Sequence, residues 1–423
     1  MQKAKVIGIG GGPKAELYAK RISIVMLALY LILSLAYQFV ARVPEVRADA
    51  AVYDNLAMDL LHGQGFNSTY RTPLYPAFLA AVYLIFGHNY QVVYAIQALA
   101  SVLTLGLMML ISRRIFGSLW IGVIASFLYV LYRPFLDSTV VVLTESVTGL
   151  LVALMVYSLI CAFDRRSVWS FLLTGVLAGL LTLCKAVALL YPFLMLPFIF
   201  AIQREKKARL SLVTALLAGF MLVVAPWTVR NYRVTGHIVP VATGGGFNFW
   251  LGNWDGYYQE KPWPWRQYPP ELAKKLAGKP EVEQDSVFMH EALQNLRNDP
   301  IGGIRILGKK FTHLWFAVGH RYVYTLEGEK IPKTVRKTTL VEAFIMLTAL
   351  VSILLRIWRS YPKAIPATVL LAYWTAAYVA ATAENRYSHP VMPLLMMLSA
   401  YTIYWALSPD ARRKRLSEVK NRA

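Results

Sequence analysis

Apolar runs, each long enough to cross a lipid bilayer, recur along most of this 423-residue chain. A helix rises about 1.5 Å per residue, so roughly 20 apolar residues cross a hydrocarbon core about 30 Å thick. Hydrophobic residues make up 57% of the chain and charged residues only 16%, which excludes an ordinary soluble enzyme. We predict an all-α polytopic membrane protein with about ten transmembrane helices. The predicted spans are residues 22–40, 91–111, 119–132, 144–163, 168–183, 186–202, 210–227, 340–358, 364–381 and 390–407.

The distribution of charge predicts how the chain crosses the membrane. Lys and Arg number 44 against 23 Asp and Glu, a net charge of +21, which in a soluble protein would suggest a nucleic-acid partner. Here the basic residues of the short connections concentrate in both tails and in alternate connections, as the positive-inside rule requires. They suit an anionic cytoplasmic leaflet. We therefore predict a plasma (inner) membrane protein that contacts membrane lipids, with both termini cytoplasmic and no nucleic-acid partner.

The same topology divides the chain into five parts. A cytoplasmic tail (1–21) precedes a transmembrane module (22–227) that carries a long outer loop (41–90). An outer, periplasmic segment of helical and irregular structure follows, and the chain ends with further transmembrane helices and a basic cytoplasmic tail; these parts are residues 228–339, 340–407 and 408–423. We expect the chemistry on the outer side.

Several short helices are expected outside the spans. Residues 54–61 have amphipathic spacing, and the apolar run 73–86 is too short to span and suits an interfacial helix. A helix over 282–296 should stop at Pro300. Residues 301–318 then predict a basic amphipathic helix on the membrane surface, with three side chains toward the headgroups: Arg305, Lys309 and Lys310.

Ionisable residues gather at the outer ends of the predicted spans. Such residues are costly near membrane depth, so each is a functional candidate. Carboxylates and cations above an apolar bundle suit a substrate with an anionic headgroup and a long hydrocarbon tail, such as a lipid phosphate. The set comprises Asp49, Asp54, Arg71, Arg133, Asp137, Glu145, Lys185, Arg230, Arg233, Glu384 and Arg386.

Four local motifs carry a family resemblance. The first is Arg47-Ala48-Asp49-Ala50-Ala51-Val52-Tyr53, and the second is Arg71-Thr72-Pro73-Leu74-Tyr75-Pro76. The third is Ala225-Pro226-Trp227-Thr228-Val229-Arg230-Asn231-Tyr232, which continues to Gly245-Gly246-Phe247-Asn248, and the fourth is Asn385-Arg386-Tyr387. In order and spacing the chain resembles the GT-C superfamily of membrane glycosyltransferases, in a bacterial branch similar to protein O-mannosyltransferases and the lipid A aminoarabinose transferase. It departs from the eukaryotic mannosyltransferases, whose acidic motif is Asp-Glu, because Ala50 follows Asp49.

The resemblance implies a GT-C fold and transfer of a sugar from a polyprenyl-phosphate donor to a glycolipid, glycan or protein hydroxyl, with inversion at the anomeric carbon. A carboxylate in reach of the acceptor hydroxyl serves as general base, and we assign Asp49 to that role. The leaving phosphate calls for positive charge, for which guanidinium groups are well shaped. We therefore expect donor-phosphate binding by Arg71, Arg230, Arg386 and Lys185.

Other assignments leave alternatives open. Glu145 falls where relatives keep a second acid; it is a second catalytic candidate that could orient the acceptor, bind a divalent cation (Mg or Mn) or hold an arginine. It could equally be a helix-entry acid favoured by the helix dipole. Asp49 could form a structural salt bridge, and the arginines could be interfacial anchors. Asp54 and Asp137 are read as solvated or capping residues.

Aromatic residues supply the candidate sugar or acceptor contacts. Three tyrosines of the motifs (Tyr53, Tyr75 and Tyr387) and Trp250 are assigned to this role. Residues 249–268 are dense in Trp and Tyr, which suits either an acceptor surface or an aromatic belt at the membrane interface. We favour the belt for this stretch.

Two other classes of function remain open from the sequence. A transporter or flippase for a lipid-linked or anionic solute would also use arginines at the membrane edge, but it usually shows related halves and a polar site at the bilayer midplane. Neither pattern is visible here. A non-catalytic relative that only binds the lipid carrier is the third class.

Overall fold

The computed structural model describes residues 13–40, 46, 48–254, 268–317, 333–355 and 357–408, and these residues form helices and loops without a strand. Long helices build one bundle: α1 (Pro13–Val40), α4 (Tyr90–Phe116), α5 (Leu119–Leu131), α7 (Glu145–Arg165), α8 (Val168–Cys184), α11 (Lys206–Thr235), α18 (Lys333–Leu354), α20 (Ile365–Ala380) and α21 (Met392–Leu407). Other helices lie in the outer loop and segment: α2 (Asp49–Leu61), α3 (Leu74–Phe86), α12 (Gly244–Leu251), α14 (Pro270–Leu276), α15 (Glu281–Asn298) and α16 (Pro300–Trp315).

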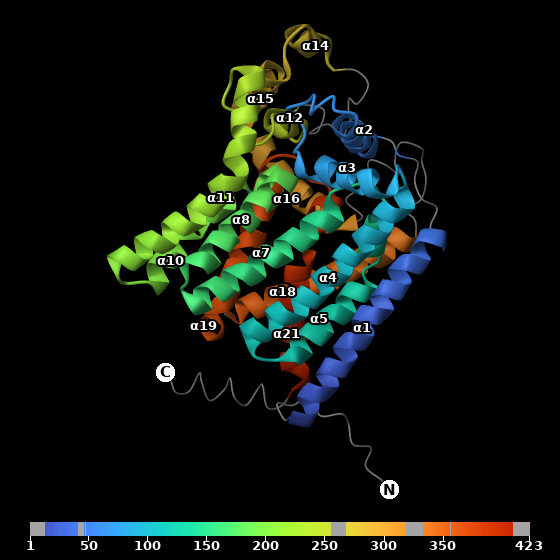
Figure 1. Cartoon of the computed structure of the whole chain (residues 1–423), viewed down its shortest axis with the longest axis vertical. Coiled ribbons are helices and arrows are strands. Elements are labelled where there is room, and N and C mark those ends of the chain that lie inside the picture. The colour runs from blue at the N-terminus through green and yellow to red at the C-terminus, as the bar shows by residue number, and fades with distance from the viewer. Residues whose placement is uncertain are drawn as a thin grey trace.

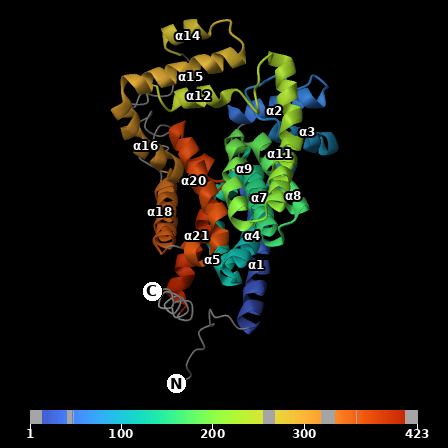
Figure 2. The same ribbon diagram turned by 90° about the vertical axis from the view of Figure 1, so that its left-hand side faces the viewer.

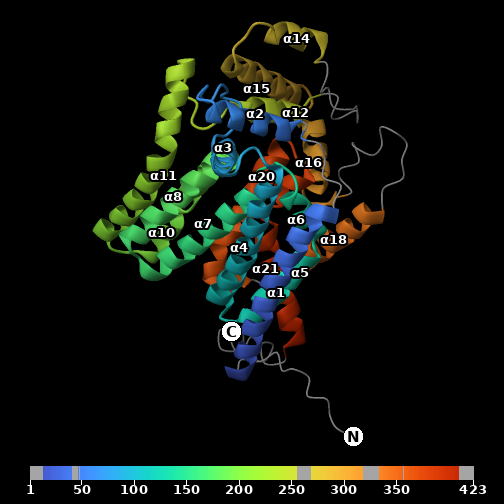
Figure 3. The same cartoon turned by 45° about the vertical axis from the view of Figure 1, so that its right-hand side comes forward.

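The outer helices gather beyond one end of the bundle. Figure 1 shows α2, α3, α12, α14 and α15 at that end, and Figure 2 shows that α1 begins and α21 ends at the opposite end. Figure 3 gives the same arrangement from a third side. One continuous apolar core runs through the bundle, and smaller cores hold α2 against α3 and α12 against α15. The all-helical membrane architecture predicted from the sequence is confirmed.

Judged by helix length, the structure has fewer complete membrane spans than the sequence predicted. Five described helices, α1, α4, α7, α11 and α18, are long and apolar enough to cross a membrane. A sixth span results if α5 is joined to α6 (Arg133–Thr139), which bends away from it by 66°. The remaining predicted spans correspond to shorter helices, so the count of ten stays a prediction.

Residues 186–202 do not form the single helix that we expected. They divide into η1 (Ala186–Leu190), α9 (Tyr191–Leu194) and α10 (Leu196–Ile202). Pro192 and Pro197 stand at the starts of α9 and α10. Proline has no backbone N–H to donate and clashes with the preceding turn, which explains the breaks. Short pieces also complete the end of the chain: α19 (Ile357–Ser360), η4 (Pro362–Ala364) and η5 (Asn385–Ser388).

The outer helices begin and end close to the predicted positions, except that α2 starts earlier, at Asp49. The expectation for Lys310 is wrong. This lysine in α16 is fully buried, and its Nζ donates to Asn253 Oδ1 at 2.8 Å and to the Ala380 carbonyl at 3.2 Å. Burial lowers the pKa of Lys310 to about 7. It therefore joins α16 to the end of α20 instead of facing headgroups.

Close backbone contact joins α8 to α11. A Cβ added at Gly175 would lie 2.0 Å from the Leu216 carbonyl oxygen, and one at Gly219 would lie 2.1 Å from that of Leu172. Small residues let membrane helices approach in this way. The contact matters for the site because α8 ends at Cys184 and α11 reaches the outer loop.

We predict that Gly219→Ala destabilises the folded protein by about 2 kcal/mol, because the added methyl forces α8 and α11 apart. Gly106→Ala is the matched control in α4, since a Cβ there meets only the Leu27 Cδ2 at 3.7 Å. Thermal unfolding in detergent would measure both variants. Equal melting temperatures would contradict the close packing of α8 on α11.

Candidate active site

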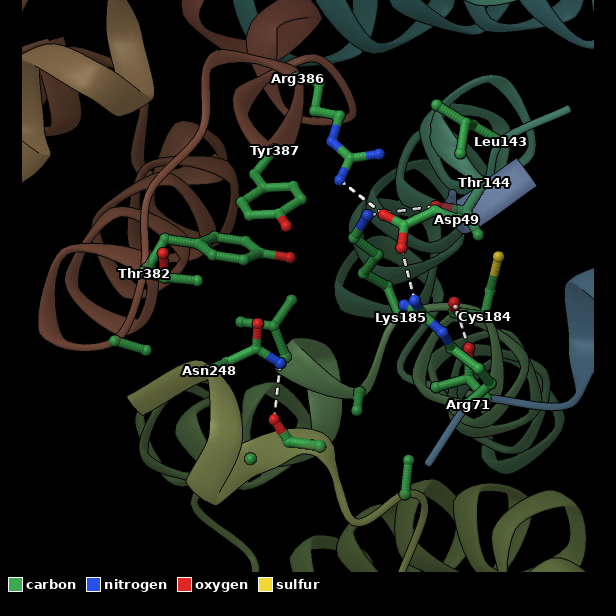
Figure 4. Close-up of a pocket in the computed structure, with 18 of the residues that line it drawn as sticks. Asp49, Arg71, Leu143, Thr144, Cys184, Lys185, Asn248, Thr382, Arg386 and Tyr387 are labelled. Atoms are coloured by element: carbon green, nitrogen blue, oxygen red, sulfur yellow. Dashed lines mark hydrogen bonds and ion pairs between the residues drawn. The ribbon is translucent and has the colours of Figure 1, made fainter. Parts of the chain in front are cut away.

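A cavity of about 340 Å³ opens at the end of the bundle that carries the outer helices. Figure 4 shows side chains reaching it from segments far apart in the sequence. Its charged lining residues are Asp49, Arg71, Glu145, Lys185 and Arg386. The sequence predicted all five for the site, and the structure brings them together.

Asp49 is the centre of this charged cluster. Its Oδ1 accepts from Arg71 Nη2 at 2.5 Å, and its Oδ2 accepts from Arg386 Nη2 at 2.7 Å. The two arginines approach the carboxylate from opposite sides (Figure 4). Burial raises the pKa of Asp49, but the attraction of Arg71 and Arg386 outweighs it and leaves the pKa below its usual value. The carboxylate is therefore ionised at neutral pH.

The local structure around Asp49 explains its placement. It is the first residue of α2, where the helix dipole favours a negative charge. The preceding residue, Ala48, has φ 50° and ψ −125°, a backbone region that favours glycine. Strain of this kind persists where the surrounding structure holds it, often at functional sites.

Arg71 and Arg386 are each held by further contacts. Thr72 donates to the Cys184 carbonyl at 2.9 Å, which ties the loop before α3 to the end of α8. The Arg71 guanidinium lies 4.9 Å from the ring centre of Tyr70 and 5.3 Å from that of Tyr53. Arg386 lies in η5, and its Nε donates to Glu384 at 2.7 Å. The two guanidinium groups are therefore fixed on the cavity wall before any ligand arrives.

Glu145 and Lys185 form a second pair in the same cavity. Glu145 begins α7 and is 5% exposed, and its Oε1 lies 3.5 Å from Lys185 Nζ. Lys185 also donates to Thr144 Oγ1 at 3.1 Å, and its Nζ lies 5.0 Å from the ring centre of Tyr387. The other oxygen, Glu145 Oε2, is buried and has no hydrogen-bond partner among the described residues.

A second cavity of about 400 Å³ lies on the other side of the wall formed by Leu143, Glu145 and Arg386. Its other polar lining residues are Arg133, Asp137, Ser138, Thr338, Asn385 and His389. The two cavities share three lining residues, so groups bound in each would meet at Glu145 and Arg386.

Three residues assigned to the site from the sequence do not line the first cavity. Arg230 donates to the Phe66 and Ser68 carbonyls and so holds the loop between α2 and α3. Tyr75 is buried and donates to Gln97 Oε1 at 2.8 Å. Trp250 packs in the core between α12 and α15. Tyr53 and Tyr387, in contrast, do line the cavity.

The aspartates outside the cluster also have specific partners. Asp54 is buried, not solvated, and accepts from the Tyr83 hydroxyl at 2.6 Å and the Tyr90 hydroxyl at 2.8 Å. Asp137 accepts from Tyr37 and pairs with Arg133 at 3.5 Å. Of the aromatic-rich stretch, residues 255–267 lie outside the described part of the chain.

The sequence reasoning missed residues that shape the site. Glu342 is buried in α18 and accepts from the Tyr132 hydroxyl at 2.6 Å, the Ala317 N–H at 2.6 Å and Asn385 Nδ2 at 3.1 Å. It thereby fixes η5, which carries Arg386. The sequence did contain a signal for Glu342, because an acidic residue inside a predicted membrane span is a candidate functional residue. Tyr378 and Thr382 also line the first cavity, and nothing in their sequence surroundings marked them. Asn248 lines it too, and it ends the continuation of the third family motif.

A role for a divalent cation stays a prediction. Among the described residues, no three His, Cys, Asp or Glu side chains are grouped so that they could hold a metal ion. Both carboxylate oxygens of Asp49 already accept from guanidinium groups.

The fold and this charged cavity define a multi-pass helical membrane protein. A family model described as dolichyl-phosphate-mannose-protein mannosyltransferase matches residues 70–229, a range that includes Arg71, Glu145 and Lys185. The resemblance to the GT-C superfamily of membrane glycosyltransferases is confirmed by this match together with the fold. No curated protein matches the chain.

Several solved structures are similar to this chain. The apo oligosaccharyltransferase of Archaeoglobus fulgidus is 14% identical, with a TM-score of 0.53 over 90% of this chain and 50% of that one. Its complex with Zn and sulfate has 14% identity and a TM-score of 0.50 over 93% and 51%. The chain thus spans about half the length of that enzyme. ArnT from Cupriavidus metallidurans, bound to undecaprenyl phosphate, gives 14% identity and a TM-score of 0.43 over 90% and 77%.

The Asp49 ion pairs predict a pH-dependent stability. A carboxylate whose pKa is lowered on folding stabilises the protein above its unfolded-state pKa of about 3.9, and this stabilisation is lost as the pH falls below that value. At pH 7 we expect Asp49→Asn to cost about 2 kcal/mol, because two guanidinium groups lose a charged acceptor. The difference in melting temperature from wild type should shrink as the pH falls from about 4 toward the folded-state pKa. A constant difference would show that Asp49 is not held as an ion.

Proposed function

We propose that this protein transfers a sugar from a polyprenyl-phosphate donor to a hydroxyl group of a glycolipid, glycan or protein, at the outer face of the plasma membrane. The observation that carries the proposal is the pairing of one carboxylate with two guanidinium groups in a cavity at the end of an apolar bundle. The apolar bundle suits the hydrocarbon tail of the donor, and the cations suit its phosphate.

In this mechanism the charge of each side chain decides whether it binds the donor phosphate or the acceptor. The donor phosphate takes hydrogen bonds from Arg71, Arg386 and Lys185, which stabilise the negative charge that develops as it leaves. The phosphate then shares the guanidinium groups with Asp49, whose carboxylate turns to the acceptor. No general acid is needed, because a phosphate is already a good leaving group.

The reaction is a single displacement. The acceptor oxygen forms a bond to the anomeric carbon while the bond from that carbon to the phosphate oxygen breaks. Asp49 takes the acceptor proton, and polyprenyl phosphate departs with the electron pair. Attack from the side opposite the phosphate inverts the anomeric configuration. Glu145, shared by the two cavities, stays on the wall between donor and acceptor and orients the acceptor hydroxyl.

Two cavities with a common wall support a reaction of two substrates. The donor phosphate belongs in the cavity that holds the cations, and the acceptor reaches the reacting carbon from the neighbouring space. The rival function, a transporter, would be expected to hold its polar site at the bilayer midplane. The charged cluster instead lies where α7 begins and where α8 and α20 end. We infer that the cluster faces the periplasm and both termini the cytoplasm.

We predict that Asp49→Asn lowers the yield of the glycosylated product at least about a hundredfold, because the acceptor proton loses its base. The measurement is mass spectrometry of envelope lipids, glycans and glycoproteins from a deletion strain restored with each variant. Asp59→Asn, in the same helix but outside the cavity, should restore the wild-type product.

Three outcomes separate the functions. A product that lacks the mass of one sugar, in the deletion strain and with Asp49→Asn, supports the transferase. Full product with Asp49→Asn, at an expression level equal to that of wild type, would contradict catalysis by this residue. A change only in solute uptake would support the transporter instead.

A further inference from the structure

The first cavity has two chemically different sides. Asp49, Arg71 and Lys185 lie on one side in Figure 4, and Asn248 and Thr382 lie across the open space from Asp49. Tyr387 stands between the two sides, with its ring centre 5.0 Å from Lys185 Nζ and 5.2 Å from the Arg386 guanidinium. We name the uncharged residues Asn248, Tyr378, Thr382 and Tyr387 the neutral wall. All four line the cavity, and none of them carries a charge at neutral pH.

Thr382 is the most informative member of the neutral wall. It is 2% exposed, and its Oγ1 has no hydrogen-bond partner among the described residues. A buried hydroxyl without a partner costs about 1–3 kcal/mol. Thr382 lines the cavity, but its Oγ1 has almost no accessible surface, so the side chain must turn about the Cα–Cβ bond before a polar group of a bound ligand can reach the hydroxyl and remove that cost.

Asn248 offers a second neutral group. Its Nδ2 donates to the Gly244 carbonyl at 2.6 Å, which fixes the side-chain amide on the turn that begins α12. Its Oδ1 is then left as a hydrogen-bond acceptor on the cavity wall (Figure 4). This acceptor suits a hydroxyl donor and repels a phosphate oxygen.

The two tyrosines complete the wall. Their rings stack, with centroids 4.8 Å apart and an angle of 22° between the planes. Each ring is half-buried, so the pair presents a rigid apolar edge and two phenol groups. The hydroxyl of Tyr387 points into the cavity (Figure 4).

We propose that the neutral wall binds the hydroxyl groups of the donor sugar, with the Thr382 hydroxyl as a hydrogen-bond partner once its side chain has turned to the ligand, while the charged side holds the phosphate. This inference rests on the proposed function, and it adds the residues that determine which sugar is accepted. Neutral groups that both donate and accept match sugar hydroxyls, and rigid aromatic edges match the carbon faces of a sugar ring. A site built to hydrogen-bond a hydroxyl discriminates strongly against a ligand that lacks it.

The test compares bare and sugar-bearing lipids without turnover. The full-length protein in lipid nanodiscs is titrated with undecaprenyl phosphate and with undecaprenyl phosphates that carry glucose, mannose, galactose, N-acetylglucosamine or 4-aminoarabinose. Wild type should bind undecaprenyl phosphate, and it should bind at least one sugar-bearing lipid more tightly. Thr382→Val, which keeps the side-chain shape but lacks the hydroxyl, should reduce that gain about tenfold and leave the affinity for undecaprenyl phosphate unchanged.

Three variants serve as controls. Thr382→Ser keeps a hydroxyl and should retain most of the gain. Thr375→Val removes a hydroxyl two turns earlier in α20, one that donates to the Leu371 carbonyl at 2.7 Å, and should leave both affinities unchanged. Asn248→Leu removes the second polar group of the wall and should also reduce the gain, which keeps the test decisive if Thr382→Val folds poorly.

The outcomes distinguish this inference from the proposed function. If wild type fails to bind undecaprenyl phosphate, the proposed function itself is contradicted. If undecaprenyl phosphate binds but the gain from the sugar is absent or is unchanged in Thr382→Val and Asn248→Leu, only the assignment of the neutral wall is overturned. An effect of Thr382→Val on acceptor affinity alone would assign the wall to the acceptor and would also overturn the inference.

Discussion

The shared carboxylate of Asp49 is the interaction on which the rest of this site depends. Two guanidinium groups beside each other repel, and near the apolar end of a helical bundle that repulsion is only weakly screened. Asp49 relieves it by accepting from Arg71, 22 residues away, and from Arg386, 337 residues away. The carboxylate therefore joins the first outer loop to the end of the chain, and a ligand phosphate can take over part of its role without leaving the cations uncompensated.

The outer segment is fastened to the same loop. Glu281, at the start of α15, accepts from the backbone N–H and the hydroxyl of Thr69, each at 2.6 Å, and from Ser68 at 3.0 Å. The Thr69 carbonyl accepts from the Thr243 N–H at 2.8 Å, next to α12. The bonds of Thr69 lie two residues before Arg71, so the outer helices help to position its guanidinium group. On the other side of Arg71 in the sequence, the bond from Thr72 to the Cys184 carbonyl ties the same loop to the end of α8. The position of Arg71 in the cavity thus depends on both the bundle and the outer helices.

The sequence predicted most helices because their signals are local. Apolar runs located the bundle helices, and an Asn-Asp-Pro stop located the end of α15. Hydropathy did not predict the structure of residues 186–202, where two prolines break the helix. In the site, the family motifs identified Asp49, Arg71 and Arg386, which the structure joins through the Asp49 carboxylate.

Other side chains have roles that depend on tertiary neighbours, which a single sequence does not contain. Arg230 belongs to a motif, yet it holds the carbonyls of a loop. Lys310 looked like an interfacial cation and is buried against the end of α20. Thr382 has no sequence signal because a hydroxyl is common everywhere, and only its unpartnered atom beside a cavity distinguishes it.

The central claim is that the cations around Asp49 hold the phosphate of a lipid donor. A structure of the full-length protein in nanodiscs, determined by electron cryomicroscopy with undecaprenyl phosphate, tests it most directly. The account predicts phosphate density within hydrogen-bond distance of Arg71, Lys185 and Arg386, with the prenyl tail leading away along the apolar bundle. Density for the phosphate elsewhere, with the Asp49 ion pairs intact and the cavity empty of lipid, would contradict it.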